Sequence, residues 1–110
     1  MFIVIGNCKE NNINYKGNVI RRVENIVSWN SCSKECDGEP ICTHWTWTTG
    51  KYSDKSLRYN CNLKTNDSGR VTNTGRISGK KGCREIGKEL YGTLYLMVYN
   101  GFQSSLARHN

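Results

Sequence analysis

Residues 28–48 of the chain read SWNSCSKECDGEPICTHWTWT, and this stretch decides the fold. Ser28 is suited to begin a helix, because its hydroxyl can accept a hydrogen bond from a free backbone N–H group of the first turn. Residues 29–36 contain neither glycine nor proline and can form about two helical turns. Asp37-Gly38-Glu39-Pro40 then ends the helix. We therefore predict a short helix over residues 29–36.

The segment after this turn alternates in polarity, as a strand with one buried face does. In Thr43-His44-Trp45-Thr46-Trp47-Thr48, the two tryptophans fall on one face, and the histidine and threonines fall on the other. We expect Trp45 and Trp47 to pack in the core against the helix. Trp29 stands in the first helical turn, and we expect it to be the more exposed tryptophan.

Six cysteines in 110 residues, all between positions 8 and 83, indicate a small domain held together by disulfides. Cys32 and Cys36 are four residues apart and share one helix face, where two sulfurs can staple the helix to a sheet. Cys36 and Cys42 flank a tight turn, so a bridge between them is sterically easy. Cys32 then needs a partner from another strand, and spacing alone does not choose among the possible pairings.

On either side of this stretch, short runs that contain apolar and β-branched residues predict further strands at residues 2–5, 19–23 and 61–64. Polar segments predict a turn within residues 9–18 and loops over residues 50–60 and 66–75. The composition changes after Cys83, where the cysteines end. We expect one domain over residues 1–88 and a C-terminal extension over residues 89–110, either an edge strand or a tail without fixed structure.

An ordered set of short motifs is similar to the PAN/apple domain family. The matching pieces are Cys8, Tyr15-x-Gly17-Asn18, Ser28-x3-Cys32-x3-Cys36, Pro40-x-Cys42-x2-Trp45-Thr46-Trp47, Cys61-x-Leu63-Lys64, and Ile77-Ser78-Gly79 before Cys83. The resemblance covers about residues 8–83 and depends on the order of the pieces, since none of them is specific to the family alone.

The resemblance implies an α+β fold, a curved antiparallel sheet around one short α-helix, stapled by disulfides. It implies three bridges: Cys8–Cys83, Cys32–Cys61 and Cys36–Cys42. It also implies a binding function toward proteins or carbohydrates without catalytic activity. The ligand varies from member to member of the family, and the framework residues do not encode it.

Composition limits the other classes of function. No apolar run reaches the roughly 18 residues of a membrane-spanning helix, and the cysteine usage is typical of a secreted protein or the extracellular part of a larger one. Residues 1–5 are apolar but too short for the core of a signal peptide. We therefore expect a fragment of a larger secreted protein, with a chain whose start has been lost as the alternative.

Metal binding and catalysis are weaker interpretations of the same residues. Cys32, Cys36, Cys42 and His44 could supply four zinc ligands, but zinc sites usually show paired cysteine knuckles, and such a site would leave the other cysteines without a role. The chain has two histidines and no nucleophile, phosphate-loop or metalloprotease motif. We expect no metal, no cofactor and no enzyme activity.

The chain is basic, with 16 Lys and Arg against 9 Asp and Glu and a net charge of +7. A positive surface attracts polyanions, which outside the cell are sulfated or sialylated glycans and acidic proteins rather than nucleic acid. The predicted ligand-binding residues are Arg21, Arg22, Lys80, Lys81 and Arg84, which would converge if Cys8 and Cys83 closed the domain. Otherwise these charges only keep the surface soluble.

The sequence thus predicts an extracellular adhesion or recognition module that binds a protein or an anionic carbohydrate, without inserting into a membrane. The alternative is a regulatory protein-interaction domain of a larger secreted protease or receptor. Asn66-Asp67-Ser68 is the single glycosylation sequon, and it predicts a glycan on Asn66 in a polar loop.

Overall fold

The computed structural model describes residues 3–5 and 8–85 and shows an α+β domain. In chain order the elements are β1 (Val4–Ile5), β2 (Lys9–Tyr15), β3 (Val19–Val23), α1 (Trp29–Asp37), β4 (His44–Thr48), the 3-10 helix η1 (Lys55–Leu57), β5 (Cys61–Lys64), β6 (Arg70–Lys80) and β7 (Cys83–Arg84). The predicted extension over residues 89–110 lies outside the described residues.

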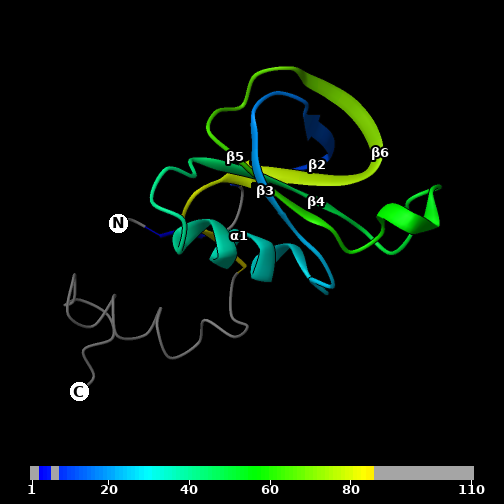
Figure 1. Ribbon diagram of the computed structural model, residues 1–110, viewed down its shortest axis with the longest axis horizontal. Coiled ribbons are helices and arrows are strands. Elements are labelled where there is room, and N and C mark those ends of the chain that lie inside the picture. The colour runs from blue at the N-terminus through cyan, green and yellow to red at the C-terminus, as the bar shows by residue number, and fades with distance from the viewer. Residues whose placement is uncertain (1–2, 6–7, 86–110) are drawn as a thin grey trace.

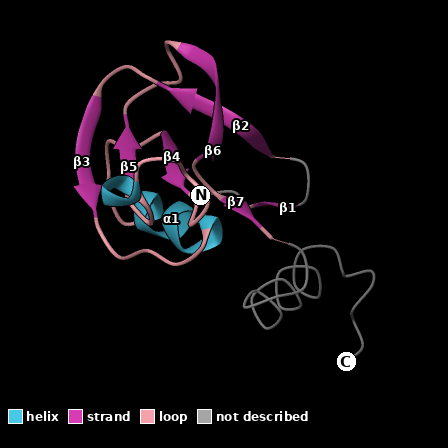
Figure 2. Cartoon of the chain, turned by 90° about the vertical axis from the view of Figure 1, so that its right-hand side faces the viewer, coloured by secondary structure: helices cyan, strands magenta, loops and turns pink. Residues whose placement is uncertain are grey.

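Within the described residues, an antiparallel sheet has the strand order β2-β6-β4-β5-β3. Strands β2 and β3 therefore form opposite edges of the sheet (Figure 2). Helix α1 packs against one face, over β4 and β5 (Figure 1). The short β1 pairs in parallel with β7. The curved, antiparallel sheet around one helix is the fold that the sequence predicts.

Helix α1 begins and ends where its local sequence requires. The side chain of Ser28 accepts a hydrogen bond from the backbone N–H of Ser31 at 3.1 Å, and such a cap stabilises a helix by about 1 kcal/mol. Gly38 closes the other end by donating its backbone N–H to the carbonyl of Glu35. The helix extends one residue beyond the predicted range, to Asp37.

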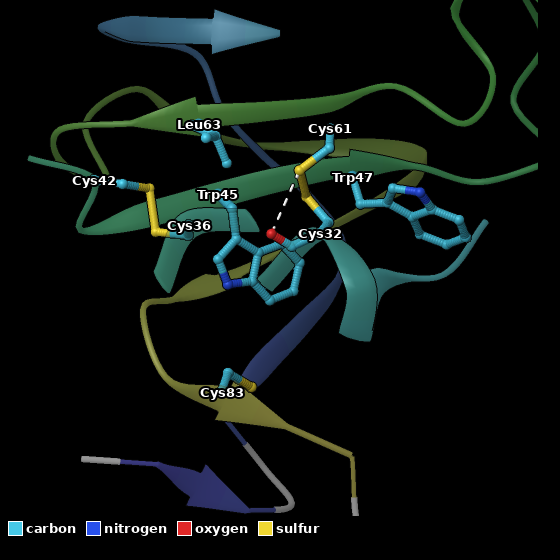
Figure 3. Close-up of a cluster of buried hydrophobic side chains, with 8 residues drawn as sticks. All are labelled: Cys32, Cys36, Cys42, Trp45, Trp47, Cys61, Leu63 and Cys83. Atoms are coloured by element: carbon cyan, nitrogen blue, oxygen red, sulfur yellow. Dashed lines mark hydrogen bonds between the residues drawn. A yellow bond between two sulfur atoms is a disulfide. The ribbon is translucent and has the colours of Figure 1, made fainter. Parts of the chain in front are cut away.

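The core lies between α1 and the sheet and consists of tryptophan, leucine and disulfides (Figure 3). Trp45 and Leu63 are fully buried opposite each other on β4 and β5. Trp45 packs flat on Gly79, where an added Cβ atom would lie 2.5 Å from the indole. A larger residue at position 79 would therefore displace the ring that fills the centre of the core.

Trp29 is the most exposed of the three tryptophans, as predicted, but it still packs on the core. Its ring stacks on Trp45 with a centroid distance of 5.8 Å and an interplanar angle of 9°, and the side chain is half-buried. Its outer face carries the ammonium group of Lys9, 5.6 Å from the ring centroid. Trp29 thus extends the core by one aromatic layer instead of facing a ligand.

Three disulfides staple the domain: Cys8–Cys83, Cys32–Cys61 and Cys36–Cys42. These are the pairs that the family resemblance implies. The Cys32–Cys61 bridge ties α1 to β5, and the Cys36–Cys42 bridge closes the turn between α1 and β4 (Figure 3). The Cys8–Cys83 bridge joins the residue before β2 to β7, and so links the five-stranded sheet to the β1–β7 pair.

Strands β2 and β6 correct two sequence predictions. Residues 9–15, predicted as part of a polar turn region, form β2, and residues 70–75, predicted as loop, belong to β6. The two strands pair along their length, and Glu10 accepts a hydrogen bond from Arg70 Nε at 2.9 Å. Their polar side chains lack the apolar alternation that indicates a strand, since much of this ribbon faces solvent on both sides.

Candidate functional site

The predicted cations Arg21 and Lys81 come together at Glu39, although they are sixty residues apart in the sequence. Arg21 Nε lies 3.5 Å from Glu39 Oε1, and Lys81 Nζ donates to the backbone carbonyl of Glu39 at 3.1 Å. Lys80 is the last residue of β6 and is exposed. It pairs with His44, whereas Arg21 is in register with Leu63 on the opposite face of the sheet. We call Arg21 and Lys81 the Glu39 cluster.

Arg22 is not part of the Glu39 cluster. Neighbouring residues of a strand point to opposite faces, so Arg22 faces away from Arg21 on β3. Arg22 is exposed, and its Nε donates to Asn62 Oδ1 at 3.4 Å on the adjacent strand β5. It adds positive charge to the other face of the sheet edge.

Arg84 has a different environment from the other four cations. Its side chain is buried, with the residue 5% exposed. One end of the guanidinium forms an ion pair with Asp37, and Nη1 donates to Ser33 Oγ at 3.2 Å and to the carbonyl of Cys83 at 3.0 Å. These contacts place Arg84 between β7 and helix α1, so we leave it out of the ligand-binding surface proposed below.

His44 stands beside Lys80 across the sheet. Burial lowers the pKa of His44, and Lys80 lowers it further, whereas Asp67 at 4.0 Å opposes both effects. Because the ordinary pKa of histidine is 6.5, His44 is mainly neutral at pH 7 and adds no charge to the Glu39 cluster.

The side chain of Lys64 is buried, which the motif Cys61-x-Leu63-Lys64 did not predict. It is 2% exposed, and its Nζ donates to the backbone carbonyl of Tyr15. Burial, with a smaller effect from Arg76, lowers the pKa of Lys64 to about 8. The lysine therefore ties β5 to the end of β2 inside the domain and is not available to a ligand.

A second candidate site is a cleft of about 800 Å³ that sequence reasoning missed. Trp47 and Tyr59 line it together with side chains from β2, β6 and the loop after β4. The two rings are 6.4 Å apart between centroids and tilted by 50°. Its lining comes from five separate segments, so no local motif could have indicated it; exposed aromatic and amide residues were the available signal.

Asn66 lies in the loop after β5, as predicted. Its Oδ1 accepts a hydrogen bond from the backbone N–H of Ser68 at 3.0 Å, which forms a local turn across the sequon. The side chain is partly exposed. Glycosylation of Asn66 stays a prediction.

Over residues 3–5 and 8–85, no three His, Cys, Asp or Glu side chains gather in a way that could hold a metal ion. In the same part of the chain, no helix is long and apolar enough to span a membrane.

Comparison with known proteins identifies the domain. No curated protein matches the chain. The family model of the PAN domain matches residues 13–64, which run from β2 to the end of β5 and include helix α1 and both of its disulfides. PAN domains are generally non-catalytic modules that mediate protein or carbohydrate interactions, and such disulfide-bonded domains are typical of extracellular regions. The chain therefore contains a PAN/apple-like domain, stapled by three disulfides.

Proposed function

We propose that this domain is an extracellular adhesion module that binds sulfated or sialylated glycans through the Glu39 cluster. The observation that carries the proposal is the convergence of Arg21 and Lys81 on Glu39, from positions sixty residues apart in the sequence. The whole chain carries a net charge of +7, so long-range attraction of a polyanion adds to the local contacts.

The hydrogen bonds of the cluster leave groups available for a ligand. An ammonium group has three donor hydrogens, and Lys81 directs one of them to Glu39. The Arg21 side chain is 46% exposed. The guanidinium of Arg21 can pair with a planar carboxylate or with a sulfate through two parallel hydrogen bonds. Glu39 holds that group in place, and the two cations outweigh its single carboxylate.

Chromatography on immobilised heparin tests this proposal. The variant K80E/K81E should elute at clearly lower salt than the wild type, because it replaces Lys81 of the cluster and the neighbouring predicted cation Lys80 by anions. The matched control is K16E/K55E, which changes the net charge by the same amount at two exposed lysines outside the cluster. The control should elute much closer to the wild type.

Equal elution of the two double variants would contradict the proposal, since retention would then depend on net charge alone. Passage of the wild type through the column at low salt would contradict it as well. That second result would favour the alternative function, a protein-interaction domain of a larger secreted protease or receptor.

A further inference from the structure

We infer that the cleft at Trp47 and Tyr59 is a second binding site, which takes an uncharged pyranose ring. The cleft has a volume of about 800 Å³ and lies between the β2–β6 ribbon, the end of β4 and the segment before α1. Among the described residues that line it, Lys51 is the single charged side chain. The site therefore differs in character from the Glu39 cluster.

The aromatic wall of the cleft is held rigidly. Trp47 is 7% exposed, and its Nε1 donates to the carbonyl of Ile26 at 2.7 Å, which fixes the indole. Tyr59 is 42% exposed. The Trp47 ring is therefore mostly buried, whereas the Tyr59 ring is open to a ligand. Rigid aromatic side chains provide contact area at a low cost in conformational entropy.

Tyr59 is held in a backbone conformation that tyrosine rarely adopts. Its φ is 67°, in the left-handed region that bulky residues avoid. Two backbone hydrogen bonds of 2.8 Å hold it there, one to the carbonyl of Thr48 and one from the N–H of Ile26. Its hydroxyl end rests on Gly50, where any Cβ atom would collide with it. The strained backbone thus presents this ring at the cleft.

The opposite side of the cleft carries neutral hydrogen-bonding groups. Asn12 stands at an irregularity in the pairing of β2 with β6, and its Oδ1 accepts from the N–H of Gly75 at 3.1 Å. This bond orients the amide, whose NH₂ group supplies donors. Thr49, Thr74 and the exposed Asn11 add hydroxyl and amide groups to the same lining.

This combination matches the two-sided chemistry of a sugar. A pyranose has an apolar C–H face that can lie on an aromatic ring, and an edge of hydroxyl groups that both donate and accept hydrogen bonds. Amide and hydroxyl side chains do the same without charge, and apolar pockets with a few placed polar groups are the usual form of small-ligand sites. A neutral lining predicts binding that is insensitive to salt, unlike binding at the Glu39 cluster.

The experiment is a titration of the ¹⁵N-labelled oxidised chain, followed by NMR, with the methyl glycosides of galactose, glucose, mannose and N-acetylglucosamine. At least one glycoside should shift the backbone signals of Thr49, Gly50 and Gly75, with an affinity that is unchanged between low and high salt. The variant Tyr59→Asn should weaken that affinity about tenfold or more, because it removes the ring but tolerates a positive φ.

Two controls separate a binding role from a folding role. Tyr59→Phe keeps the ring and should retain most of the affinity for the glycoside. Ile41→Asn removes an exposed apolar side chain that does not line the cleft, and it should leave that affinity unchanged. The absence of shifts at the cleft with all four glycosides would overturn the inference, as would equal affinity of the Tyr59→Asn variant. The variant K80E/K81E should bind the glycoside normally, so this inference and the proposed function can fail independently.

Discussion

At the residue scale, Lys64 makes the free energy of unfolding change with pH in the alkaline range. Its pKa falls from the ordinary 10.5 to about 8 in the folded chain, because the ammonium group is buried. Between these two values the unfolded state binds more protons than the folded state, so the free energy of unfolding rises with pH. The gain between pH 8 and pH 10.5 is up to about 3 kcal/mol.

Urea unfolding of the wild type and Lys64→Met across this pH range checks the prediction. The variant should lose the part of the upward slope that belongs to Lys64, whereas Lys55→Met, at an exposed position, should keep it. Parallel slopes for the wild type and Lys64→Met would show that the buried amine does not titrate in this range.

Arg84 provides a second prediction at this scale, because it forms a buried ion pair with Asp37. Arg84→Met leaves a partly buried carboxylate without its charged partner and should lower the free energy of unfolding by about 3–5 kcal/mol. Removing both charges in Asp37→Asn/Arg84→Met should recover part of this loss. Arg22→Met, at an exposed site, should stay within about 0.5 kcal/mol of the wild type. An Arg84→Met variant of wild-type stability that elutes early from heparin would contradict this account.

At the scale of elements, the disulfides should contribute unequally. In the chain-entropy view, a bridge that closes a longer loop restricts the unfolded state more. Cys32 and Cys61 are separated by 29 residues, and Cys36 and Cys42 by 6. We expect C32A/C61A to lose about 4 kcal/mol and C36A/C42A about 2 kcal/mol in urea unfolding. The reverse order would show that native contacts at the α1–β4 turn outweigh chain entropy.

The elements also show which parts of the fold a sequence can reveal. Helix α1 was predictable because its cap and its cysteine spacing are local signals, and β4 because its alternation is strict. The β2–β6 ribbon was not, since its strands are polar and its partners are some sixty residues apart, as Glu10 and Arg70 are. The cleft escaped prediction for the same reason.

The sequence also did not show which of the predicted cations are exposed and which are buried in ion pairs. Arg21 and Arg84 are the same residue type in similarly basic stretches, but one is nearly half-exposed and the other lies against Asp37. The difference depends on which carboxylate the fold brings near, and the sequence does not give that distance. Closure of the domain was expected to bring all five predicted cations together. Arg21 and Lys81 meet at Glu39. Arg22 and Lys80 lie on the opposite face of the sheet, and Arg84 pairs with Asp37.

At the scale of the whole molecule, one disulfide-stapled domain carries two surfaces of different chemistry. The Glu39 cluster is cationic and lies where β3, the turn after α1 and the end of β6 meet. The cleft is nearly neutral and is lined by β2, β6 and the aromatic residues Trp47 and Tyr59. A glycan that carries both acidic groups and uncharged sugars could contact the two surfaces through different parts of its chain.

The proposed function requires that the cations of the Glu39 cluster attach the domain to an anionic glycan. Its most direct test is the affinity for a heparin oligosaccharide, measured by calorimetry at several salt concentrations. Binding that releases counterions gives a logarithm of affinity that falls linearly with the logarithm of salt concentration. We expect such a fall for the wild type, a slope shallower by about two for K80E/K81E, and a nearly unchanged slope for K16E/K55E. Indistinguishable slopes for the wild type and K80E/K81E would contradict it.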